Sequence, residues 1–143
     1  MFKRTIAFSI VVWSASMGIG YAQQCLHGRD ETPDQASRRR EALTATRTIN
    51  NIQANRPAAT SGLYLRHVEL AGAPFAANMR ESTNDAIRRI SLNPQDDILP
   101  GWKLTLNVSE NGYWFMIKDM VDPCGFAFIS NQAGVIFSAE PIR

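Results

Sequence analysis

The residues best suited to chemistry are few and scattered along the chain. Two histidines, His27 and His67, stand 40 positions apart, and neither has a second metal ligand at helical spacing. We expect each to be a solvated polar residue. The sequence also lacks the G-x-S-x-G elbow of serine hydrolases. It therefore predicts no catalytic residue, no metal ligand and no cofactor-binding residue.

One pair of carboxylates gives an alternative. Asp96 and Asp97 are adjacent, and such acids can contribute to a glycosidase site or a Ca²⁺ site. We expect a solvated turn there instead. A small periplasmic enzyme that uses Asp96, Asp97 and His67, with its site in the 57–100 segment, remains the rival hypothesis.

The first 22 residues have the pattern of a secretory signal. Lys3 and Arg4 precede an apolar run that ends near Trp13, and small residues occupy the cleavage positions before and at Ala22. We predict a signal peptide at 1–22, a single domain at 23–143, and a periplasmic or secreted location. Removing the signal also removes the only candidate membrane span.

The net charge of the mature chain limits the classes of partner that we expect. The net charge of +2 comes from Lys3 and Arg4 in the signal, so the mature chain is neutral. A neutral chain gives no reason to expect nucleic acid or an anionic membrane as partner.

The two cysteines, Cys25 and Cys124, are read most simply as one disulfide in an exported protein. Two thiols that never meet, or a lipid anchor on Cys25, are the alternatives. A bridge would tie the mature N-terminus to the body of the domain.

A helix is expected to begin at Pro33. Thr32 and Gln35 form a capping box, and Pro57 ends the helix near residues 53–54. Apolar residues recur at spacings of three and four and predict a narrow buried stripe; they are Ala42, Ala45, Ile49 and Ile52.

The segment 57–100 is divided by prolines and glycines into pieces too short for long elements. Short helices are expected at 65–70 and 84–89. Residues 90–92 fit either a short strand or a helix end.

The C-terminal part has the alternating pattern of four antiparallel strands. Asn111-Gly112 predicts a two-residue turn, which pairs Val108 with Phe115 and leaves Trp114 on the opposite face. Phe128 and Phe137 are expected to lie close together in the core.

Two surfaces are candidates for contact. Trp114 and Met116 point away from the core, so either the middle segment covers them or they form an exposed patch for another protein. Arg38, Arg39 and Arg40 are the most concentrated charge. They form either a solvated helix face or a docking strip for an acidic partner or a polyanion.

Three stretches together resemble the globular part of type IV pilins and type II secretion pseudopilins. Residues 41–52 look like the exposed half of a pilin helix, 62–70 are similar to the segment that follows it, and 128–136 are similar to the closing hairpin. The resemblance implies a pilin-like α+β fold, an N-terminal amphipathic helix packed on a four-stranded antiparallel meander. The apolar run lies before the predicted cleavage site, so the prepilin assembly helix is missing.

These observations together predict an exported, non-catalytic, pilin-like protein that acts through protein–protein contacts in the cell envelope. Its partner would be an envelope protein.

Overall fold

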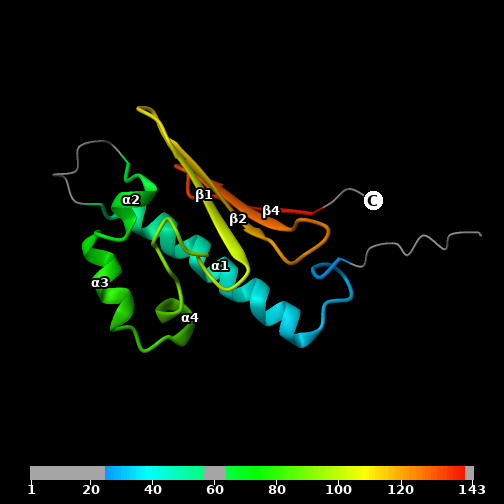
Figure 1. Ribbon diagram of the computed structural model, residues 1–143. Coiled ribbons are helices and arrows are strands. Elements are labelled where there is room, and N and C mark those ends of the chain that lie inside the picture. The colour runs from blue at the N-terminus through cyan, green and yellow to red at the C-terminus, as the bar shows by residue number, and fades with distance from the viewer. Residues whose placement is uncertain (1–24, 57–63, 141–143) are drawn as a thin grey trace, which may run out of the picture.

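The computed structural model describes residues 25–56 and 64–140. One long helix, α1 (Pro33–Ala54), packs against a four-stranded antiparallel sheet, and short helices lie beside α1 (Figure 1). The predicted α+β class is confirmed. The predicted signal peptide lies outside the described residues, and among those residues no helix has the length and apolarity to cross a membrane.

Helix α1 begins as its sequence predicts. The Gln35 amide donates to the Thr32 hydroxyl, and the Thr32 amide donates to the Gln35 side chain, so the capping box is complete. The predicted stripe is almost fully buried. Its two alanines keep the helix surface shallow, so α1 can lie close to the sheet.

The sheet is a meander of β1 (Trp102–Val108), β2 (Tyr113–Asp119), β3 (Ala127–Asn131) and β4 (Ile136–Ala139), in that spatial order. Its inner face buries large side chains against α1. Phe115 and Ile117 are completely inaccessible and Phe128 is nearly so. The core therefore lies on one side of the sheet only.

The predicted hairpin register is wrong by two residues. Val108 pairs with Tyr113 instead of Phe115, so the loop contains four residues, and the Ser109 amide donates to the Gly112 carbonyl. Gly112 does not adopt the positive φ that the predicted two-residue turn requires. Because side chains alternate with a period of two, a slip of two residues leaves every side chain on its predicted face.

The predicted contact between Phe128 and Phe137 is also wrong. Phe128 pairs with Ser138, whereas Phe137 pairs with Ile129. Phe128 is therefore on the inner face, and Phe137 is on the outer face with 56% of its surface exposed.

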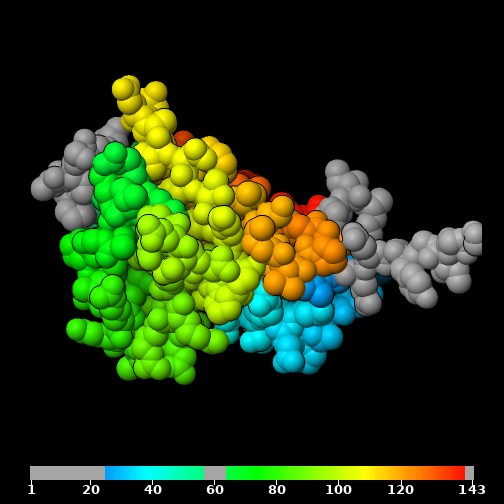
Figure 2. Space-filling model, in the orientation of Figure 1, coloured from blue at the N-terminus to red at the C-terminus, as the bar shows by residue number. Residues whose placement is uncertain are grey.

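The middle segment forms α2 (His67–Leu70), α3 (Pro74–Arg80) and α4 (Asp85–Arg88). The two predicted short helices are confirmed, α3 was not predicted, and residues 90–92 form no strand. This segment packs beside α1 and β1 (Figure 2). It extends the core sideways and inserts Met79, Ile98 and Leu99 into it.

A buried glutamine joins the middle segment to α1. The Gln53 side chain donates to the Leu65 carbonyl at 2.7 Å and accepts from the Leu65 amide at 2.9 Å. Gln53 is fully inaccessible to solvent. It satisfies both backbone groups of Leu65, as a neighbouring strand would.

We predict that Gln53→Leu lowers the free energy of unfolding by about 2–4 kcal/mol, because two buried backbone groups lose their partners. Urea denaturation followed by circular dichroism measures the loss. Asn51→Leu, at an exposed position two residues earlier in α1, is the matched control and should change stability little. Equal losses in the two variants would contradict this role of Gln53.

Candidate functional site

The outer face of the sheet is the candidate site. Strand pairing arranges its side chains in three rows that run across the strands. The first row holds Lys103, Lys118, Ala127 and Ala139; the second holds Thr105, Met116, Ile129 and Phe137; the third holds Asn107, Trp114 and Asn131.

This face carries an apolar strip. Met116 and Ile129 are half-buried neighbours in the second row, Phe137 lies beside Ile129, and Trp114 adjoins them from the third row with 46% of its surface exposed. We call these four residues the open-face strip. The sequence left two alternatives for Trp114 and Met116, and the described part of the middle segment does not cover Trp114.

The charged side chains on the outer face of the four strands are all basic. Lys103 and Lys118 are direct cross-strand neighbours, and none of the outward-facing residues of the four strands is acidic. A surface complementary to this face would combine apolar side chains with carboxylates.

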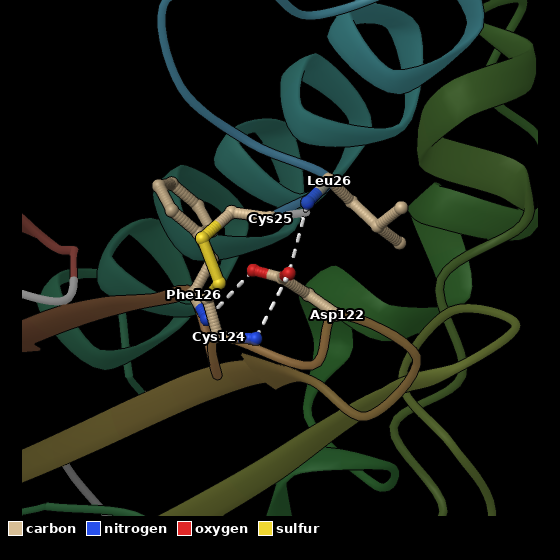
Figure 3. Close-up of a disulfide and its surroundings, with 5 residues drawn as sticks. All are labelled: Cys25, Leu26, Asp122, Cys124 and Phe126. Atoms are coloured by element: carbon tan, nitrogen blue, oxygen red, sulfur yellow. Dashed lines mark hydrogen bonds between the residues drawn. A yellow bond between two sulfur atoms is a disulfide. The ribbon is translucent and has the colours of Figure 1, made fainter. Parts of the chain in front are cut away.

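A second cluster fastens the N-terminal segment to the end of the sheet. The predicted disulfide between Cys25 and Cys124 is present, with a Cα–Cα separation of 5.2 Å (Figure 3). Asp122 reinforces it: the Leu26 and Cys124 amides donate to Oδ1, and the Phe126 amide donates to Oδ2. One buried carboxylate thus holds both sides of the bridge.

His27 lies next to this bridge and is buried, so the expectation that it is solvated is wrong. Its Nδ1 is 2.7 Å from Glu31 Oε1, and its Nε2 is 2.9 Å from Asp119 Oδ2. The imidazole ring thus lies between two carboxylates, with one ring nitrogen within hydrogen-bond distance of each.

Two of the three consecutive arginines complete the cluster. Arg38 donates to both oxygens of Asp119 and to the Pro100 carbonyl, and Arg39 donates to both oxygens of Glu31. The third, Arg40, is exposed. We call the disulfide, Asp122 and this ionic cluster of His27, Glu31, Asp119, Arg38 and Arg39 the N-terminal clasp.

Electrostatics in the clasp favours the ionised carboxylates. The hydrogen bond from Arg39, aided by His27, lowers the pKa of Glu31 although its burial opposes this. Burial raises the pKa of Asp119, but hydrogen bonds from His27, the Val121 amide and Arg38 outweigh it, so that pKa lies below its ordinary value.

Sequence reasoning missed Glu31, Asp119 and Asp122. A signal for Asp119 was present: it continues the alternation of inward-facing Tyr113, Phe115 and Ile117, and a carboxylate at an inward position needs a buried partner. The sequence pattern of β2 does not identify His27 as that partner, because it is the disulfide that brings the N-terminal segment to the end of β2.

The residues of the rival enzyme hypothesis do not form a cluster. Asp96 accepts from Ser91 and Asn93, and Asp97 accepts from the Gly101 amide. Both acids are exposed, as predicted. In residues 25–56 and 64–140, no hydrogen bond links His67 to either acid, and no group of three potential ligands is arranged for a metal ion.

We predict that Asp119→Asn lowers the free energy of unfolding by about 3 kcal/mol, because it removes the buried carboxylate that His27 and Arg38 share. Chemical denaturation at pH 7 measures this. Glu110→Gln, at an exposed loop position, should change stability by less than about 0.5 kcal/mol. Similar losses in both variants would show that His27 does not depend on Asp119.

Acid should weaken the clasp. The folded-state pKa values of Glu31 and Asp119 lie below their ordinary values of 4.5 and 3.8, so their stabilisation is complete above about pH 4.5 and is lost as pH falls through the lowered values. The stability difference between wild type and Glu31→Gln should therefore shrink as pH falls below about 4.5 in denaturation experiments. A difference that stays constant over this range would contradict the assignment; Glu110→Gln is again the control.

Comparison with known proteins finds no matching family model, no similar curated protein and no similar solved structure.

Proposed function

We propose that this chain is an exported, non-catalytic protein that works by protein–protein contact in the cell envelope, with the outer face of its sheet as the contact surface. The observation that carries the proposal is the open-face strip. Aromatic residues and methionine are enriched in protein interfaces, and this face combines them on neighbouring strands of a rigid sheet.

Export is supported by two features. The signal-like sequence of residues 1–22 is one, and the disulfide from Cys25 to Cys124 is the other, because disulfides persist mainly in oxidising compartments. The bridge begins three positions after the predicted cleavage site, so it would secure the new N-terminus.

A pilin-like character is part of the same proposal. Its support is the order of elements: a single long helix, an irregular middle segment, and a four-stranded antiparallel meander. Because the apolar run would be removed with the signal, the mature protein would be an accessory contact module that does not enter a filament through its own helix.

The pattern of charge specifies the partner further. Lys118 lies two residues from Met116 along β2, which is about 7 Å. We infer a partner protein whose surface places carboxylates opposite the lysines and apolar side chains opposite Met116, Ile129 and Phe137.

A photo-crosslinking amino acid at position 137, in cells that export the protein, tests the proposal. We expect a defined protein adduct that is weakened by Met116→Ala and by Lys118→Glu. Position 68 is the matched control, since Val68 is 65% exposed but lies on α2, away from the sheet. The proposal fails if position 137 gives no adduct, or only the adducts that position 68 gives.

A further inference from the structure

A pocket lies beside the open-face strip, at the loop end of the hairpin formed by β1 and β2. Its volume is about 580 Å³, within the range of small-molecule sites. The polar side chains that line it come from the ends of three strands and from the hairpin loop. Together with Trp114 we call them the amide pocket: Asn107, Ser109, Asn111, Trp114, Asn131 and Gln132.

Strand register places an aromatic side chain between two amides. Asn107 pairs with Trp114, and Trp114 pairs with Asn131, so the three side chains lie side by side on the outer face, about 5 Å apart between strands. Gln132 reaches the hairpin loop from the turn after β3: its side-chain oxygen is 2.9 Å from the place where a Cβ on Gly112 would lie. A side chain at position 112 would displace the end of the Gln132 side chain.

Most of these amides are free to bind a ligand. Asn131 Oδ1 accepts from the Ala133 amide, and the Ser109 hydroxyl donates to the Gly112 carbonyl. Within the described residues, the side chains of Asn107, Asn111 and Gln132 make no hydrogen bond. Each amide offers two donors and one acceptor oxygen, so the pocket presents both kinds of group beside an aromatic ring.

The pocket contains no charge. Tyr113 is its only titratable lining residue, and the Tyr113 hydroxyl donates to Asn50 on the inner side of the sheet. Glu110 is in the same loop but is not among the lining residues. The nearest lysine on the outer face, Lys118, is four residues from Trp114 along β2, about 13 Å away.

We propose that the amide pocket binds a neutral saccharide. A sugar ring has an apolar C–H face that packs on the negative face of an indole ring, and its hydroxyl groups donate to and accept from amides. A nucleobase would also stack on Trp114, but its phosphates require cations. The same argument excludes acidic polysaccharides.

This inference goes beyond the proposed protein contact and does not depend on it. The protein contact uses the second row, with Phe137 at its end, whereas the saccharide would use the third row and the hairpin loop. Trp114 lies at the boundary. Phe137→Ala should therefore affect only the protein contact, and Asn107→Ala and Gln132→Ala should affect only saccharide binding.

The test is an NMR titration of the full chain with four uncharged hexasaccharides: cellohexaose, maltohexaose, chitohexaose and mannohexaose. We expect at least one to shift the Trp114 indole N–H signal and the side-chain amide signals of Asn107 and Gln132. Trp114→Ala should weaken binding about tenfold or more, and Asn107→Ala or Gln132→Ala should weaken it about threefold to tenfold. Trp114→Phe should retain part of the affinity.

Two controls make the result decisive. Phe137→Ala removes another exposed aromatic residue, outside the pocket, and should leave saccharide affinity unchanged. Oligo-dT and a heparin hexasaccharide should not shift the pocket signals. The proposal is overturned if none of the four neutral sugars binds, if only the anionic ligands bind, or if Phe137→Ala weakens binding as much as Trp114→Ala does.

Discussion

The packing of a single long helix against one face of a four-stranded sheet is the constraint on which the rest of the structure depends. The narrow stripe of Ala42, Ala45, Ile49 and Ile52 lets α1 lie close to the inner face, and the middle segment adds its apolar residues at the side of that contact. The described chain supplies no second layer for the outer face. The exposure of Trp114 and Phe137 is thus a consequence of how this fold distributes its helices.

The N-terminal clasp complements this packing with polar interactions. Asp119 ends β2 on the inner face, where an ionised carboxylate is costly unless it is paired. His27 and Arg38 supply the pairing, and the disulfide keeps His27 close enough to do so. The covalent bridge and the ion pairs therefore support each other at the end of the sheet.

Sequence reasoning succeeded where a local pattern decides the structure. The limits of α1, its buried stripe, the faces of β1 and β2 and the disulfide followed from caps, periodicity and cysteine count. It failed where distant parts of the chain decide: the burial of His27 requires β2, and the outward position of Phe137 requires the register of β3 with β4. The hairpin of β1 and β2 shows the same difference. Its register depends on the length of the loop, which was predicted wrongly, whereas the alternating pattern still places each side chain on its predicted face.

The position of the disulfide in the chain determines how the protein would transmit force. Cys25 precedes every helix and strand described, and Cys124 stands between β2 and β3. Tension between the two ends of the domain would pass directly through the bridge, so α1, the middle segment, β1 and β2 would be shielded from it. Only the hairpin of β3 and β4 lies outside this covalent loop. Under load that hairpin would detach first and would carry Ile129 and Phe137 away from the sheet. Trp114 and Met116 would stay in place, because β2 carries no tension.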